Sequence, residues 1–148
     1  MIVLHVLTGC EMDVRERLIE YKPILPMEHR LMRINRVWTN VPRVVMPGYV
    51  FLDMNINDDE YYRVRDVSGV IRLLNYHDPL PADEAATIRQ MAHTMLEPHV
   101  IDAQGKVVSG FFKTENLIAV YKRQRRAVFT IRLLNRKTTV TVSATFLQ

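Results

Sequence analysis

The chain has 148 residues and a net charge of +4, and its 48% hydrophobic and 24% charged residues are typical of a globular protein rather than a disordered one. Its single cysteine, Cys10, excludes an internal disulfide and a cysteine-based zinc site. No apolar stretch approaches the roughly 20 residues needed to cross a bilayer, so we expect a cytoplasmic protein without a membrane partner.

The chain is predicted to open with a strand followed by a helix. Residues 2–7 form a short apolar run of the kind found in β-strands. Thr8 and Glu11 are spaced as a capping box, and apolar residues then recur at helical spacing as far as Tyr21. Pro23 closes this helix.

Residues 28–45 interleave arginines with apolar residues. Leu31–Ile34 and Arg43–Val45 are predicted to be the arms of a hairpin that turns at Thr39-Asn40. An aromatic side chain among basic ones can stack on single-stranded DNA and neutralise it. The candidate contacts in this hairpin are Arg30, Arg33, Arg36, Trp38 and Arg43. A solvated hairpin with its tryptophan packed against the sheet explains the pattern equally well, and both interpretations stay open.

The clearest predicted strand is Tyr49–Met54. Asn57, followed by acidic residues, is expected to start a second helix, and Val70–Leu74 a further strand. A third helix is expected to start near Asp83. Residues 1–97 therefore indicate a first module of order β-α-β-β-α-β-α, an antiparallel sheet backed by helices.

Residues 98–105 show no periodicity and are predicted to be a linker. Short β-prone segments separated by turn-like or basic residues follow it, at the spacing expected of a small barrel. The predicted strands are Lys106–Phe112, Leu117–Lys122, Ala127–Leu134 and Thr138–Val142.

Charge divides the chain in the same way. Residues 1–99 carry 11 Lys/Arg and 14 Asp/Glu, whereas residues 100–148 carry 9 Lys/Arg and 2 Asp/Glu. Such asymmetry indicates two modules with different partners, of which the basic one can attract a polyanion.

Basic side chains of the second module are candidate phosphate contacts, with the densest cluster at residues 122–126. The candidates are Lys122, Arg123, Arg125, Arg126, Arg132, Arg136 and Lys137. The alternative is a solvated turn on a barrel that binds a protein, such as a ribosomal protein or a termination factor. A charge run does not decide between RNA, DNA and protein.

Several motifs of the first module resemble the NusG family of transcription factors, which includes the specialised members RfaH and LoaP. Met46-Pro47-Gly48-Tyr49-Val50-Phe51-Leu52 resembles the family's Phe-Pro-Gly-Tyr-Val strand. Val3 to Glu11 resembles its first strand and Gly-Glu helix entry, and Tyr62 to Val70 its Val-Arg and Gly-Val passage. Pro79-Leu80-Pro81 resembles the entry to the last helix of the family's N-terminal domain.

The second module resembles a diverged KOW barrel. Gly110-Phe111-Phe112 stands where the family has Gly-Pro-Phe, and Asn135-Arg136 where it has a Gly-Arg hairpin. The resemblance implies an α+β protein with an N-terminal NGN domain at 1–97, a linker at 98–105 and a small SH3-like KOW β-barrel at 106–148.

What the resemblance implies about function is binding rather than catalysis. The family's first domain lies on the clamp of RNA polymerase beside the DNA channel and, by bridging that channel, favours continued elongation. The matching positions here are Leu4, Val6, Tyr49 and Phe51 for the clamp, and Glu60, Tyr61 and Tyr62 for the opposite side of the channel. A simple core role is the alternative for Tyr49 and Phe51, which share one face of their strand.

The residues themselves indicate no enzyme and no cofactor. Cys10 falls on the apolar stripe of a predicted helix, without an oriented base beside it. No glycine-rich phosphate loop and no metal-ligand spacing are present. The functional hypothesis is therefore an elongation or antitermination factor that binds RNA polymerase and a nucleic acid or coupling protein. A stand-alone RNA-binding or ribosome-associated module is the alternative, and it does not require an exposed aromatic patch around Tyr49 and Phe51.

Overall fold

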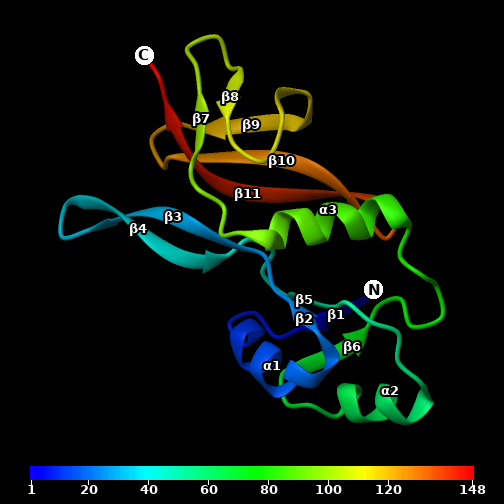
Figure 1. Ribbon diagram of the computed structural model, residues 1–148. Coiled ribbons are helices and arrows are strands. Elements are labelled where there is room, and N and C mark those ends of the chain that lie inside the picture. Colours follow the sequence, from blue (N-terminus) through cyan, green and yellow to red (C-terminus); the bar gives the residue numbers. More distant parts are fainter. The chain divides into compact units, whose positions relative to one another are not determined.

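The computed structural model describes all residues from Met1 to Gln148, and the contacts within the chain divide it into two units (Figure 1). Unit 1 comprises Met1–Leu25 and Met46–Ala92, and unit 2 comprises Pro26–Val45 and His93–Gln148. Each unit is built from two segments, because the chain leaves unit 1 after residue 25 and returns to it at residue 46.

Unit 1 contains a four-stranded antiparallel sheet of order β2-β5-β1-β6. Its strands are β1 (Ile2–Val6), β2 (Pro23–Ile24), β5 (Tyr49–Leu52) and β6 (Val70–Leu73). The apolar runs predicted at 2–7, 49–54 and 70–74 are confirmed as strands.

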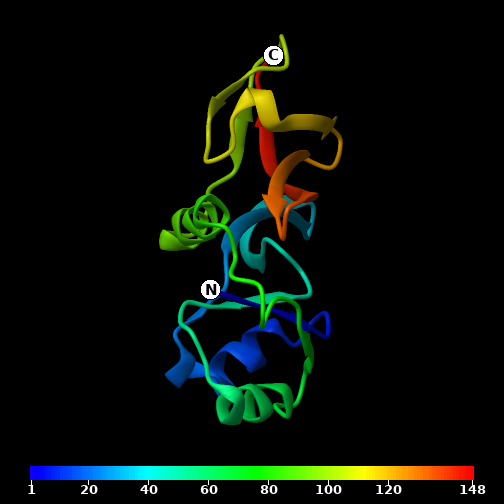
Figure 2. The same cartoon turned by 90° about the vertical axis from the view of Figure 1, so that its right-hand side faces the viewer.

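Three helices complete unit 1, namely α1 (Glu11–Arg17), α2 (Asp58–Arg65) and α3 (Ala82–His93). The last residue of α3, His93, already belongs to unit 2. Helices α1 and α2 lie on one side of the sheet and α3 on the other (Figures 1 and 2). With lengths of 7, 8 and 12 residues, none of them is long and apolar enough to cross a membrane.

The capping box predicted for α1 is wrong, whereas the helix start predicted at Asn57 is confirmed. Helix α1 begins after Cys10, which makes no side-chain cap. The carboxylate of Glu11 instead accepts the backbone N–H groups of Gly9 and Gly48, each at 2.8 Å. Because Glu11 is buried, its charge needs such hydrogen-bond donors. The bond to Gly48 also fixes the loop that leads into β5. Helix α2 carries a true capping box, in which the side chain of Asn57 accepts from the backbone of Glu60 and the reverse bond is also present.

Unit 2 joins a hairpin to a five-stranded sheet of order β8-β7-β11-β10-β9. The hairpin is β3 (Met27–Ile34) and β4 (Val37–Val44). The sheet strands are β7 (His99–Ile101), β8 (Val107–Ser109), β9 (Leu117–Tyr121), β10 (Arg126–Leu133) and β11 (Arg136–Phe146). Alternate residues of β10, including Ala127, Phe129 and Ile131, point into the core of this unit.

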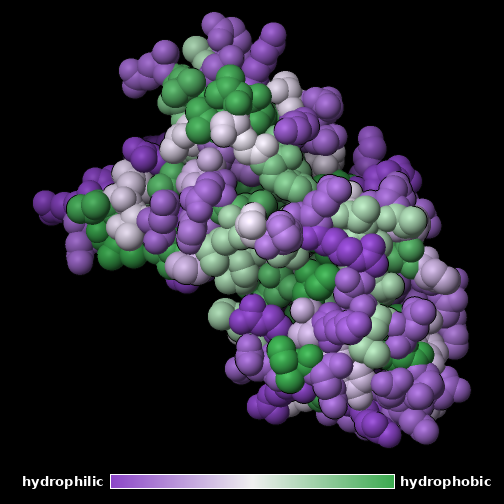
Figure 3. Space-filling model, viewed as in Figure 1, coloured by the Kyte–Doolittle hydropathy of each residue, from purple (hydrophilic) through white to green (hydrophobic).

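The hairpin differs from its prediction in length and turn. Its arms pair over eight residues each, and the turn is at Asn35-Arg36 rather than at Thr39-Asn40. Both turn residues have positive φ angles, 50° and 68°, as the tightest hairpin connections require. Asparagine readily adopts a positive φ angle and arginine does not, so the sequence contains only a weak signal for a turn at these two residues. Figure 3 shows hydrophilic and hydrophobic side chains next to each other on the hairpin, in keeping with its mixed sequence.

Two further differences concern the predicted division of the chain. The segment 98–105 contains β7, which pairs in parallel with β11, so it is part of the sheet rather than a free linker. The hairpin groups with the barrel strands, since the backbone N–H of Leu31 donates to Ser143 Oγ at 2.8 Å on β11. The family's domain boundaries at residues 97 and 106 stay a prediction.

Candidate nucleic-acid interface

Two basic segments that are far apart in the sequence meet within unit 2. The turn between β9 and β10 carries the basic cluster at residues 122–126, and the guanidinium carbon of Arg125 lies 4.4 Å from the ring centroid of Trp38 on β4. Arg125 has a positive φ of 55°. The tryptophan is half-buried, and its contact with Arg125 is a cation–π interaction.

An open groove runs along this contact, with a volume of about 630 Å³. The hairpin supplies the apolar side chains and one cation, and the β9–β10 turn and the first residue of β10 supply the other two. The lining residues are Leu31, Met32, Arg33, Trp38, Arg123, Gln124 and Arg126. A surface of this composition can stack a planar ring and neutralise phosphates at the same time.

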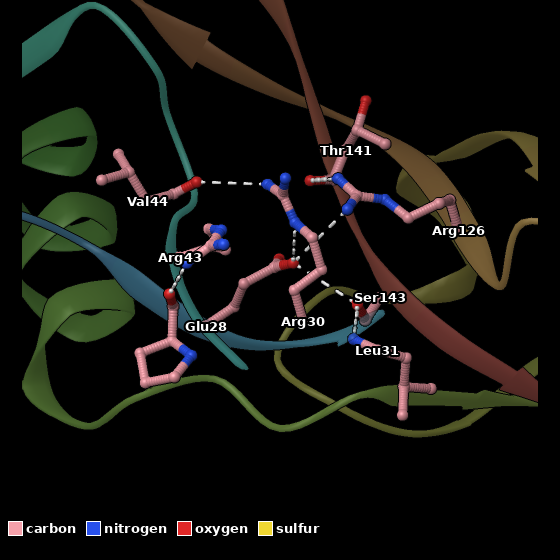
Figure 4. Close-up of polar contacts among 9 residues, drawn as sticks. Glu28, Arg30, Leu31, Arg43, Val44, Arg126, Thr141 and Ser143 are labelled. Atoms are coloured by element: carbon pink, nitrogen blue, oxygen red, sulfur yellow. Dashed lines mark hydrogen bonds and ion pairs between the residues drawn. The ribbon is translucent and has the colours of Figure 1, made fainter. Parts of the chain in front are cut away.

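The buried carboxylate of Glu28 ties the hairpin to the sheet beside this groove (Figure 4). Glu28, 1% exposed, accepts from Arg30 Nε at 3.2 Å through its Oε1 atom, and Arg126 Nη1 lies 3.8 Å from the same oxygen. Ser143 Oγ is 3.5 Å away and donates to it. Arg126 also donates to the carbonyl oxygen of Thr141 at 3.0 Å. Residues of β3, β10 and β11 are thereby linked through one carboxylate.

Burial governs the electrostatics of this cluster. Loss of solvation raises the pKa of Glu28 above its ordinary value, and the charges of Arg126 and Arg30 only partly oppose this effect. Burial also lowers the pKa of Arg126. Arg30 and Arg126 are therefore occupied in holding the hairpin against the sheet, and they are less free to bind phosphate than the exposed arginines.

Apart from Arg30, which pairs with the buried Glu28, the predicted nucleic-acid residues fall into three groups. Arg33, Trp38, Arg123, Arg125 and Arg126 are brought together at the groove. Arg36, Arg43 and Lys122 are exposed but do not line it. Arg132, Arg136 and Lys137 are exposed at the opposite end of β10 and β11, roughly 20 Å along the strands from Arg126.

Sequence reasoning missed two residues that position this site, Glu28 and Ser143. An acidic residue in the arginine-rich hairpin was a possible signal for an ion pair. Nothing in the sequence indicated that Ser143, more than 110 residues away, would bond to the same segment.

In unit 1, burial corrects part of the predicted partner-binding surface. Leu4 and Phe51 are 0% exposed and Val6 is 1% exposed, which contradicts placing their side chains on a surface. The reason is that β1 and β5 are the central strands of the sheet, with helices over both faces. Tyr49 is half-buried and stacks on Phe51, with 6.4 Å between ring centroids. Of that pair, only Tyr49 presents a side chain to solvent.

Helix α2 carries an accessible aromatic cluster. Tyr62 is 53% exposed, its ring lies 5.3 Å from that of Tyr61, and the guanidinium of Arg65 lies 4.8 Å above it. Tyr76 packs on Tyr61 at 4.5 Å and donates to a carboxylate oxygen of Asp58 at 2.6 Å, which raises the pKa of Tyr76 to about 12. The predicted contact Glu60 is half-buried, and its carboxylate is used in the capping box of α2. Tyr76 joins this cluster without having been predicted.

Comparison with known proteins identifies the family of the chain. The family model described as "Transcription termination factor nusG" matches residues 2–92, more than half of the sequence. The chain belongs to the NusG family. This family consists of transcription regulators, not enzymes. The match confirms the resemblance predicted from the Met46–Leu52 motif, while the narrower resemblance to RfaH and LoaP stays a prediction.

A solved structure supports the same fold. A chain described as "Domain interaction in Thermotoga maritima NusG" matches with a TM-score of 0.52 and 17% identity, over 96% of this chain and 92% of that one. At this identity the match shows the fold alone, and it confirms the α+β class with a small β domain after the N-terminal one. No curated protein sequence matches the chain.

Proposed function

We propose that this NusG-family chain is a transcription elongation or antitermination factor that binds RNA polymerase through unit 1. Unit 2, with its basic barrel strands and hairpin, binds a nucleic acid or a coupling protein. The observation that carries this proposal is the family match over residues 2–92, which spans all of the polymerase-binding candidates.

The polymerase-binding surface that we propose is smaller than the one expected from the sequence. It consists of the accessible aromatic residues Tyr49, Tyr61 and Tyr62. Phe51 stacks on Tyr49 from within the sheet, whereas Leu4 and Val6 are buried on the opposite face and take no part in this surface. Exposed tyrosines are frequent anchors of protein interfaces, because they bury much area with few rotatable bonds. The carboxylate of Glu60 keeps α2 and its two tyrosines in place through the cap.

The nucleic-acid side of the proposal is supported by charge. Residues 100–148 carry a balance of +7, and most of these cations are exposed. Such a surface attracts polyanions and loses affinity as salt rises.

A pull-down of purified bacterial core RNA polymerase by the full chain tests the anchor. The Tyr49→Ala/Tyr62→Ala variant removes two side chains of the proposed surface. Tyr121→Ala is the matched control, because Tyr121 is an exposed tyrosine of unit 2 with a similar exposed fraction. We expect the wild type and the control to retain polymerase and the double variant to lose most of it.

The second candidate function is a stand-alone RNA-binding or ribosome-associated module. One observation favours it, namely that Phe51 is buried and Tyr49 half-buried, so unit 1 lacks the fully exposed aromatic pair. If the wild type retains no polymerase but binds RNA, this second function replaces the first.

A further inference from the structure

We propose that the groove between the β3–β4 hairpin and the β9–β10 turn is one binding site for a segment of single-stranded nucleic acid. In this site a base stacks on Trp38, and phosphates pair with Arg33, Arg123 and Arg125. The proposal rests on the nucleic-acid half of the proposed function and names its ligand and its site. In this proposal the β3–β4 hairpin and the β9–β10 turn form one binding surface.

Neither segment forms the groove alone. The hairpin contributes Trp38 and Arg33, which face each other across the β3–β4 ladder, and the turn contributes Arg123 and Gln124. Arg125 reaches across to the tryptophan ring at 4.4 Å. The tryptophan ring, Arg33 and Arg123 from two distant chain segments therefore line the same open space, and Arg125 lies over that ring.

The cations at the groove differ in whether they already pair with a carboxylate. In this region Glu28 forms ion pairs with Arg30 and Arg126 and thereby holds the hairpin on the sheet. Arg33 and Arg123, which line the groove, and Arg125, which lies over Trp38, form no ion pair with a carboxylate in the chain, so these three guanidinium groups have no counter-charge. Phosphate groups supply that charge, and bidentate pairing suits the guanidinium group.

Trp38 is half-buried in the groove, and the side chain over its ring, that of Arg125, is half-buried too. A contact between a cation and an aromatic ring that is still partly solvated is weaker than a fully desolvated one. Base–aromatic stacking is stronger and independent of sequence, so a base can displace the guanidinium group, which then turns to a phosphate. Only an unstacked base can reach the ring. Duplex nucleic acid keeps its base faces covered, so the geometry points to a single strand.

The chain offers a direct readout, because Trp38 is its single tryptophan. The full chain is titrated with 12-nucleotide oligo-U RNA, oligo-dT DNA, an abasic strand of equal length and a duplex of equal length, in the absence of polymerase. We expect both single strands to quench the tryptophan fluorescence, and the abasic strand and the duplex to leave it unchanged. The strand that binds with higher affinity shows whether the natural ligand is RNA or DNA.

Variants are compared by the anisotropy of a labelled strand. Trp38→Ala is expected to weaken binding by about tenfold or more, and Trp38→Tyr to restore most of it. The triple variant Arg33→Ala/Arg123→Ala/Arg125→Ala is expected to weaken binding strongly. It is also expected to flatten the dependence of log K on log salt by about 2, which corresponds to three lost contacts with a single strand. The charge-matched control Arg72→Ala/Lys106→Ala/Lys113→Ala removes three exposed cations that do not line the groove, and it is expected to change affinity by about threefold or less.

Several results would overturn the proposal. These are binding without tryptophan quenching, equal affinity for duplex, equal losses in the two triple variants, or no binding at all. Thermal melts of each variant show whether it is folded. If Trp38→Ala is unfolded, the role of the aromatic ring is judged from the affinity of Trp38→Tyr instead. Retention of polymerase is measured on the same variants, so a failure of this site is distinguished from a failure of the polymerase anchor.

Discussion

Acidification is expected to destabilise unit 2 through His99, which is 0% exposed at the centre of the barrel strands. Its Nε2 atom accepts the backbone N–H of Phe112 at 3.0 Å, and its ring packs against those of Phe112 and Phe129, at 5.5 Å and 5.1 Å. The neutral ring fits this apolar setting. Burial therefore lowers the pKa of His99 from 6.5 to about 4.

The sign and size of the effect follow from proton linkage. The folded chain keeps His99 neutral down to about pH 4, whereas the unfolded chain protonates it below about 6.5. Stability from this group is fully present above pH 6.5 and is lost as pH falls towards 4. Each pKa unit corresponds to about 1.4 kcal/mol, so the loss is about 2 kcal/mol at pH 5 and about 3 kcal/mol at pH 4.

The assay is urea unfolding of the full chain at pH 7 and pH 5 at constant ionic strength, followed by the fluorescence of Trp38, which lies in the same unit. The variant His99→Gln retains an acceptor for Phe112 but does not titrate. The other histidines are present in both proteins and cancel in the comparison. The free energy of unfolding of the wild type should fall by about 2 kcal/mol more than that of the variant. Equal losses in the two proteins would refute the reasoning.

The remaining predictions concern single contacts, each measured by urea unfolding of the full chain. Glu28→Ala should lower the free energy of unfolding by about 2 kcal/mol or more, because it leaves Arg30 and Ser143 without their buried acceptor and opens a cavity; no loss would contradict the role of Glu28 in holding the hairpin. Gly110→Ala should cost roughly 2–3 kcal/mol, since φ is 137° and the added Cβ would meet His99 Cδ2 at 2.3 Å; a neutral result would show that the ring can move aside. Arg89→Ala should cost less than about 1 kcal/mol although Arg89 binds Asp53 at 2.9 Å, because the two side chains are 50% and 31% exposed; a larger loss would point to a further role of Arg89.

Sequence patterns correctly predicted those strands and helices that depend on neighbouring residues. The strand at Tyr49–Leu52 and the helix that begins after Asn57 are where the β-propensity and the acidic helix start placed them. The basic character of the last third of the chain also follows from composition alone. These features depend on neighbours within a few residues, so a single sequence contains what is needed to find them.

Features that depend on tertiary contacts were missed. Glu11 has the spacing of a capping box with Thr8, but its carboxylate bonds to Gly48, 37 residues away. The hairpin turn at Asn35-Arg36 places an arginine at positive φ, against its local preference. Phe51 resembles a surface aromatic by family analogy, yet its strand is central and covered on both faces.

The candidate interface shows the same limit. The arginines of the hairpin and of the β9–β10 turn were identified as separate candidates from charge and aromatic content. Their meeting at one groove depends on bonds between residues more than 110 positions apart, such as that from Leu31 to Ser143. No periodicity or spacing in the sequence encodes such a contact.

The most direct test of the proposed function is the affinity of the full chain for core RNA polymerase, measured by titration of a labelled chain with the enzyme. We expect saturable binding that the Tyr49→Ala/Tyr62→Ala variant loses and the Tyr121→Ala variant keeps. Binding that both variants keep would place the anchor elsewhere on the chain. The absence of binding by the wild type would contradict the proposal that this protein acts on transcribing polymerase.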